Sequence, residues 1–107
     1  MSQNIVFLHS LKSDADPAAY ERWVLEVDYP LTLRQPGVIS YEVTPLAVAV
    51  SGAEPAPFQY LEVIEVEDAV AYQRNLEQTD DQEFKQMMGE WADYVDRYVG
   101  SVGSPLR

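Results

Sequence analysis

The chain has 107 residues, of which 47% are hydrophobic, no cysteine and a formal net charge of −11. This length predicts a single domain over residues 1–107 with a core of moderate size. The lack of cysteine excludes disulfides, thiolate catalysis and cysteine-ligated zinc. The seven lysines and arginines are scattered. The clustered basic face that nucleic acid or an anionic membrane needs is therefore not expected.

The first half of the chain predicts a strand, a helix and a second strand. Residues 5–10 are a short β-rich run. Asp16 before Pro17 is typical of a helix N-terminus. Apolar residues then recur at helical spacing until the QPG of residues 35–37 ends the helix; they are Tyr20, Trp23, Val24, Val27 and Leu31. Residues 38–44 follow as the second strand.

The second half predicts a strand, two helices and a weak last strand. A connection dotted with prolines spans residues 45–57, and residues 58–66 read as a strand. A short helix covers residues 68–78, and Thr79 with Gln82 forms a capping box for a longer helix. The apolar stripe of that helix runs from Phe84 to Val95 and Tyr98. The glycine-rich residues 98–106 form the fourth strand.

The order β-α-β-β-α-β predicts an α+β, ferredoxin-like fold: a four-stranded antiparallel sheet with helices on one face. We assign these residues to the helix side: Val6, Leu8, Ile39, Tyr41, Val43, Leu61 and Val63. The open side then carries Ile5, Phe7, His9, Val38, Ser40, Glu42, Phe58, Tyr60, Glu62 and Ile64. Because a half-apolar open face is unfavourable in water, we expect a second copy to cover it. The result would be a homodimer, a dimeric α+β barrel.

Four stretches of the sequence carry a family resemblance: residues 20–30 (YERWVLEVDYP), 37–43 (GVISYEV), 59–68 (QYLEVIEVED) and 83–96 (EFKQMMGEWADYVD). They resemble the RedY-like (HapK) family of the dimeric α+β barrel superfamily. Its members occur with gene sets for prodiginine-type pigments and related bisindole or pyrrole natural products. The resemblance implies an accessory step, such as condensation, dehydration or cyclisation, on a small aromatic intermediate.

His9 and Glu62 are the first candidates for catalysis. His9 is the only histidine, and an imidazole titrates near neutral pH, so it can act as a general acid or base. Glu62 lies among apolar residues of the third strand, where a carboxylate is costly unless it is paired or protonated. The two could pair across neighbouring strands. Alternatively, His9 only fills the sheet interior and Glu62 is solvated.

Asp28, Tyr29 and Pro30 stand together inside the first helix. Proline lacks the N–H that a helix needs, so the helix should bend or loosen here. The bend would open a gap in which Asp28, as a third catalytic candidate, and Tyr29, as a substrate-binding one, face a ligand. In the alternative interpretation, Pro30 begins a second short helical turn and Asp28 is its cap.

The remaining candidates for substrate binding are Phe7, Trp23 and Tyr60, although Trp23 and Tyr60 also suit the core.

No metal-ligand cluster, phosphate-cradling loop or dinucleotide fingerprint is present, so we expect no metal and no cofactor. No apolar run could cross a bilayer and no secretory signal is recognised, so we expect a cytoplasmic protein. Two functions remain open. One is a cofactor-independent enzyme, and the other is a non-catalytic dimer that binds and shields a reactive small molecule.

Overall fold

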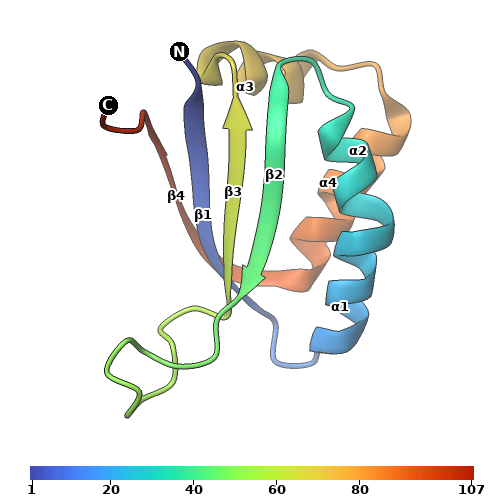
Figure 1. The fold of residues 1–107 in the computed structure, drawn as a ribbon. Coiled ribbons are helices and arrows are strands. Elements are labelled where there is room, and N and C mark those ends of the chain that lie inside the picture. Colours follow the sequence, from blue (N-terminus) through green and yellow to red (C-terminus); the bar gives the residue numbers. More distant parts are fainter.

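The computed structural model describes residues 1–107 and has an α+β, ferredoxin-like architecture. Its elements are β1 (Gln3–Leu11), α1 (Pro17–Trp23), η1 (Val24–Asp28), α2 (Tyr29–Leu33), β2 (Val38–Pro45), β3 (Tyr60–Val66), α3 (Ala69–Gln78), α4 (Gln82–Tyr94) and β4 (Val95–Gly103). The strands are antiparallel and lie in the order β2-β3-β1-β4. Figure 1 shows α1, α2 and α4 along one side of the sheet, with α3 across one end. No helix is long and apolar enough to span a bilayer.

The segments α1, η1 and α2 form one continuous helical stretch. The expected N-cap is confirmed, because the Asp16 carboxylate accepts a hydrogen bond from the Ala18 N–H at 3.1 Å. In η1 the turn widens to π geometry, and the Tyr29 N–H bonds to the Val24 carbonyl. A π-bulge adds one residue to a helical turn. Here it directly precedes Pro30, so the chain stays helical past the proline.

Two expectations about α4 are wrong. The N-cap of α4 is Asp81, which accepts from the Phe84 N–H at 3.1 Å. The Thr79 hydroxyl instead accepts from the Asp81 N–H at 3.1 Å, so the expected capping box does not form. Asp81 directly precedes the helix and supplies the stronger acceptor. The helix also ends at Tyr94, and the residues expected to extend its stripe, Val95 and Tyr98, lie in β4.

The predicted faces of β1 and β3 are wrong. The helices cover Ile5, His9, Tyr60, Glu62 and Ile64, all of which are buried. Both strands carry large apolar residues on their two faces. The alternation therefore shows which residues share a face, but it does not show which face the helices cover.

The predicted faces of β2 are correct for Tyr41 and Val43, which pack against core residues. A β-bulge between Val38 and Ser40 changes the alternation. Val38 therefore packs on the same core as Tyr41, and Ile39 is 50% exposed instead of lying under the helices.

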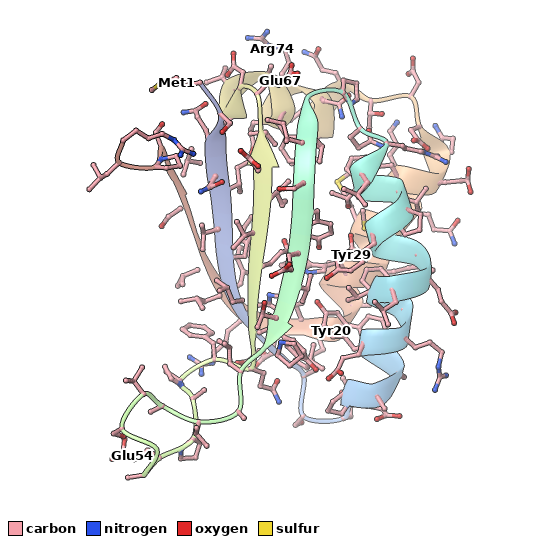
Figure 2. The ribbon with its side chains drawn as sticks, in the orientation of Figure 1. Met1, Tyr20, Tyr29, Glu54, Glu67 and Arg74 are labelled. Atoms are coloured by element: carbon pink, nitrogen blue, oxygen red, sulfur yellow. The ribbon has the colours of Figure 1, made fainter.

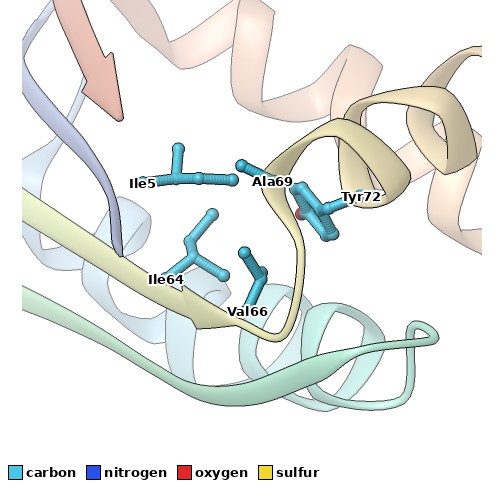
Figure 3. Close-up of a cluster of buried hydrophobic side chains, with 5 residues drawn as sticks. All are labelled: Ile5, Ile64, Val66, Ala69 and Tyr72. Carbon is cyan, nitrogen blue, oxygen red and sulfur yellow. The ribbon is translucent and has the colours of Figure 1, made fainter. Parts of the chain in front are cut away.

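Three separate apolar clusters join the helices to the sheet. One cluster combines Ile5 of β1, Ile64 and Val66 of β3, and Ala69 and Tyr72 of α3 (Figure 3). A second contains Leu11, Tyr20, Val24 and Tyr60, and a third contains Leu31, Phe84 and Met87. Leu76 packs against both the first and the third cluster, and Trp23 against both the second and the third. Residues of the first and third clusters line the pocket described below.

The other face of the sheet carries no helix. In the register of β1 with its neighbouring strands, Val6 lies opposite Val63, and Leu8 lies opposite both Leu61 and Val99. These five apolar residues therefore share this open face. The loop of residues 46–59 projects from the end of the sheet, with Glu54 near its tip (Figure 2). The open face therefore remains apolar, but through residues other than those expected from the sequence.

The observed faces of the sheet predict that truncating two isoleucines to alanine lowers the free energy of unfolding by different amounts. Ile64→Ala should lower the free energy of unfolding by about 2–5 kcal/mol, because it leaves a cavity under the helices. Ile39→Ala, at a half-exposed position, should cost less than about 1 kcal/mol. Urea unfolding of both variants measures the difference, and equal costs would contradict the assigned faces.

Candidate active site

A pocket of about 210 Å³ lies between the helix-covered face of the sheet and helices α2, α3 and α4. Its lining residues are mostly apolar: Ile5, Phe7, Ile64, Tyr72, Leu76, Phe84, Met87, Met88 and Trp91, with Asp28, Thr32, Tyr41, Glu62 and Gln73 as the others. Gln73 of α3 is the one exposed side chain among them. An apolar cavity with a few convergent polar groups is typical of a small-molecule site.

The polar groups of the pocket form one buried network. The Tyr41 hydroxyl oxygen lies 2.6 Å from Asp28 Oδ2 and 2.9 Å from Glu62 Oε1. The Thr32 hydroxyl donates to Asp28 Oδ1 at 2.9 Å. Asp28 and Glu62 are 2% and 5% exposed. One phenol therefore bridges two carboxyl groups that are both out of contact with water.

The network requires a proton on one carboxyl group. A phenol has a single proton and can donate to only one acceptor at a time. Asp28 accepts from both Tyr41 and Thr32, and these bonds favour its ionised form. Glu62 has Tyr41 as its one hydrogen-bond partner. The consistent arrangement has the Glu62 carboxyl donating to the Tyr41 oxygen, and the Tyr41 hydroxyl donating to Asp28.

The electrostatics of the pocket agree with this arrangement. Burial, together with the nearby Asp28 charge, raises the pKa of Glu62 to about 8. Burial also raises the pKa of Asp28, but the hydrogen bonds from Tyr41 and Thr32 oppose that rise. Burial raises the pKa of Tyr41 as well, and the two carboxyl groups add to the effect. At neutral pH the pocket therefore contains a neutral carboxylic acid beside a carboxylate.

The widened turn η1 places Asp28 at this site. Asp28 has helical backbone angles and makes no capping hydrogen bond from its side chain, so the interpretation of Asp28 as a helix cap is wrong. Its carboxyl group instead reaches Tyr41 on β2 and Thr32 one turn later. Such π-bulges occur frequently at functional sites.

His9 lies on the same face of the sheet as Glu62, but the two side chains make no hydrogen bond to each other. The His9 ring is fully buried and its Nε2 lies 2.7 Å from the Tyr20 hydroxyl. Burial lowers the pKa of His9 to about 4. Its Nδ1 is buried without a partner. His9 does not line the pocket; its ring packs against Trp91, which does, at 5.5 Å between centroids.

The other candidates separate into two groups. Phe7 lines the pocket, and its ring lies so close to β4 that a Cβ on Gly100 would be 2.7 Å from it. Tyr29 and Tyr60 line a second, smaller hollow of about 150 Å³. The Tyr29 hydroxyl accepts from the Val43 N–H at 2.8 Å, and Tyr60 donates to Glu21 at 2.8 Å. Figure 2 shows Tyr20 and Tyr29 on the helical stretch beside the sheet.

Trp23 lies outside both hollows. Its indole N–H donates to Glu90 Oε1 at 3.1 Å, and its ring packs on Tyr20 and Tyr94. The structure brings Asp28, Glu62 and Phe7 together at one pocket and leaves the other candidate residues outside it.

The sequence did not single out Tyr41 or Trp91 as site residues; Tyr41 was only assigned to the helix side of the sheet. Tyr41 was expected under the helices and Glu62 on the opposite face, so their contact could not be anticipated. No group of three or more histidine, cysteine, aspartate or glutamate side chains is arranged to hold a metal ion. The carboxyl and hydroxyl groups at the pocket can transfer protons and form hydrogen bonds.

Comparisons with known proteins agree with this architecture. The family model described as REDY-like protein HapK matches residues 3–106. The crystal structure of HapK from Hahella chejuensis is 25% identical, with a TM-score of 0.71, and the match covers 97% of this chain and 92% of that chain. No curated protein sequence matches this chain significantly.

More distant structures share the fold alone. SnoaB from Streptomyces nogalater, described as a cofactor-independent oxygenase, is 14% identical with a TM-score of 0.71; the match covers 99% of this chain and 94% of SnoaB. A dimeric ferredoxin-like protein of unknown function from Thermobifida fusca is 11% identical with a TM-score of 0.70, covering 98% and 92%.

The raised pKa of Glu62 predicts how stability depends on pH. Between the unfolded pKa of about 4.3 and the folded pKa of about 8, the folded chain keeps a proton that the unfolded chain loses. The free energy of unfolding should therefore fall as pH rises through this window and level off above it. Glu62→Gln removes the titrating group and should flatten the curve.

The measurement is urea unfolding from pH 7.5 to 9, where His9 is largely neutral in both states and adds little slope. Glu65→Gln on the same strand is the control, because hydrogen bonds from Ser2 and Ser40 lower the pKa of Glu65. That carboxyl group stays ionised throughout, so the slope should remain. A Glu62→Gln variant with the parental slope would contradict a protonated Glu62.

Proposed function

Because the chain belongs to the HapK (REDY-like) family, we propose that it is an accessory protein of secondary-metabolite biosynthesis, of the prodiginine or bisindole type. We propose further that it is a cofactor-independent enzyme that transfers protons during condensation, dehydration or cyclisation of a small aromatic intermediate. The observation that carries this proposal is the Asp28–Tyr41–Glu62 network at an otherwise apolar pocket.

The network supports proton transfer in either direction. Glu62 gives its proton to an oxygen of the ligand, for example a hydroxyl group that then leaves as water. The Tyr41 proton can then turn from Asp28 towards the new Glu62 carboxylate, which stabilises it. After the C–O bond breaks, Glu62 takes a proton from the ligand cation, which completes the dehydration and restores the carboxylic acid. A carboxyl group with a pKa near the working pH is suited to such a cycle.

The size and lining of the pocket support a small aromatic ligand. A cavity of about 210 Å³ is smaller than the roughly 300–1,000 Å³ of sites for drug-sized ligands. It is larger than the roughly 150 Å³ cavity that accepts benzene. Phe7, Tyr72, Phe84 and Trp91 supply aromatic faces. SnoaB, which has this fold, is described as acting without a cofactor, which is compatible with such chemistry here.

One observation favours the second function, a dimer that binds and shields a reactive molecule. The only histidine is buried away from the pocket and its pKa is lowered to about 4. The most versatile acid–base side chain is therefore not available there. Binding without turnover is the outcome expected of a shielding protein.

Variants of the network test catalysis. The protein is incubated with pairs of pyrrolic or indolic aldehydes and amines, and condensation products are followed by mass spectrometry. Glu62→Gln keeps the shape of Glu62 but cannot transfer a proton, so turnover should fall by about 100- to 10,000-fold while ligand affinity is kept. Turnover by the parent should also decline above pH 8, where Glu62 ionises.

Glu65→Gln is the matched control, since Glu65 lies on the same strand outside the pocket and should leave turnover unchanged. A Glu62→Gln variant as active as the parent would exclude Glu62 as the proton donor. Binding of the aldehydes by the parent without any product would favour the shielding function instead.

We also propose that the chain is a homodimer joined through its open sheet faces. The open face carries Val6, Leu8, Leu61, Val63 and Val99, and an apolar patch of this kind marks an interaction surface. The protein from Thermobifida fusca, described as dimeric, has the same fold. The alternative, a free monomer, would leave this patch in water.

Light scattering coupled to size-exclusion chromatography measures the assembly. The parent should have twice the chain mass of 12.1 kDa. Val63→Arg should give a folded monomer, because an arginine on the open face would bury an unpaired charge between the two sheets. Val70→Arg on α3, where the side chain is 66% exposed, is the control and should stay dimeric. A monomeric parent would refute the proposal.

A further inference from the structure

Tyr72 of α3 carries a hydroxyl group that has no partner within the protein. The side chain is 5% exposed, yet its hydroxyl makes no hydrogen bond to the chain. The other two buried tyrosines are paired. The Tyr20 hydroxyl bonds to His9 at 2.7 Å. That of Tyr60 bonds to Glu21 at 2.8 Å. Because most buried hydroxyl groups are hydrogen-bonded, the Tyr72 hydroxyl is available to a partner from outside the chain.

The Tyr72 hydroxyl is within reach of a small molecule. Two unpaired polar atoms of the chain are sealed off completely, and they are His9 Nδ1 and Trp91 Nε1. The Tyr72 oxygen is unpaired but is not one of these sealed atoms, so an atom the size of a water oxygen can touch it. Tyr72 lines the pocket, and its ring is packed in an apolar cluster. The accessible surface of its oxygen therefore opens into the pocket.

The hydroxyl lies at the end of the Tyr72 ring that is farthest from α3. Figure 3 shows this ring reaching from α3 towards Ile5 and Ile64 of the sheet, with which it forms one cluster. Both isoleucines line the pocket. Glu62 lies two residues before Ile64 and therefore on the same face of β3. Tyr72 and Glu62 thus border one pocket, the first from α3 and the second from the sheet.

Glu62 presents a second unpaired atom to this pocket. Its Oε1 lies 2.9 Å from the Tyr41 hydroxyl, whereas Oε2 has no aligned donor and is not sealed. With the proton of Glu62 on Oε1, Oε2 is an acceptor. Burial raises the pKa of Tyr72, and the carboxyl groups of Glu62 and Asp28 add to the rise, so the Tyr72 hydroxyl keeps its proton. The pocket therefore offers a ligand one donor, from α3, and one acceptor, from β3.

We infer that Tyr72 is a ligand-binding residue whose hydroxyl donates a hydrogen bond to an oxygen, typically a carbonyl oxygen, of a flat aromatic ligand. This inference deepens the proposed function and rests on it for the choice of pocket. The rings of the ligand lie against Phe7, Phe84 and Met87, and its reacting group lies at Glu62. Tyr72 holds the ligand and transfers no proton. Aromatic molecules that carry a carbonyl group are therefore preferred over the same rings without one.

Two indoles that differ in one group test the inference without any turnover. Indole-3-carbaldehyde carries the carbonyl oxygen, and 3-methylindole lacks it. Isothermal titration calorimetry should show that the parent binds the aldehyde more tightly. Tyr72→Phe removes the hydroxyl and keeps the ring, so the affinity for the aldehyde should fall by about 2- to 10-fold, the range expected for one hydrogen bond. The affinity of this variant for 3-methylindole should equal that of the parent.

Tyr94→Phe is the matched control, because Tyr94 is a partly buried tyrosine outside the pocket. This variant should bind both compounds as the parent does. Tyr72→Phe should melt close to the parent temperature, since no group of the chain loses a hydrogen-bond partner. The comparison of the two compounds on the parent protein gives a result that does not depend on either variant.

Equal affinities of the parent for the two compounds, or an unchanged preference in Tyr72→Phe, would overturn the inference. An equal loss of affinity for both compounds would indicate a structural role for Tyr72 and would overturn it as well. A preference that depends on Tyr72, without any turnover by the parent, would leave the inference standing and count against catalysis. Turnover that depends on Glu62, with an unchanged preference in Tyr72→Phe, would count against the inference alone.

Discussion

Two carboxyl groups and one phenol hydroxyl share the interior between the helices and the sheet. Asp28 and Glu62 are both buried, and the Tyr41 oxygen lies within 2.9 Å of each. Burying two negative charges at this distance would be prohibitively costly, so one carboxyl group keeps its proton. The three residues come from the helical stretch, β3 and β2 respectively. Their hydrogen bonds therefore also link the helical stretch to the sheet.

The widened turn of the helix brings Asp28 into this network. A regular helix would bring Asp28 to a different angle around its axis, since a π turn adds one residue. With the turn in place, Asp28 reaches Tyr41 on one side, while Tyr29 on the next position bonds to the backbone of Val43. The π turn before Pro30 thus keeps the chain helical past the proline and also places Asp28 and Tyr29 against the sheet. The proline ring is exposed, and the residues just before it carry the contacts to the sheet.

The pocket lies where residues of two apolar clusters face each other, Ile5, Ile64 and Tyr72 on one side and Phe84 and Met87 on the other. Aromatic rings from β1, α4 and β4 pack against one another beside the pocket, and two of them, Phe7 and Trp91, line it. Gly100 makes this packing tight, because any side chain there would collide with Phe7. The result is an apolar chamber with its polar groups near one another. Such a low-dielectric chamber strengthens hydrogen bonds to a ligand and to a transferred proton.

The order of helices and strands, the Asp16 cap and the ferredoxin-like fold could be predicted from the sequence, because turn residues, caps and periodicity are local signals. Asp28 and Glu62 also stood out locally, as a carboxylate beside a helical proline and one within an apolar strand. The covered face of the sheet could not be predicted. Ile5 and Val6, or Val63 and Ile64, are equally apolar neighbours, and only the direction from which the helices pack distinguishes them. The bulge at Ile39 and the end of α4 at Tyr94 likewise depend on the register with neighbouring strands. Only the tertiary structure therefore brings together Asp28, Tyr41 and Glu62, which are far apart in the chain. Hydrogen bonds between distant segments produce no periodic pattern in a sequence from which they could be predicted.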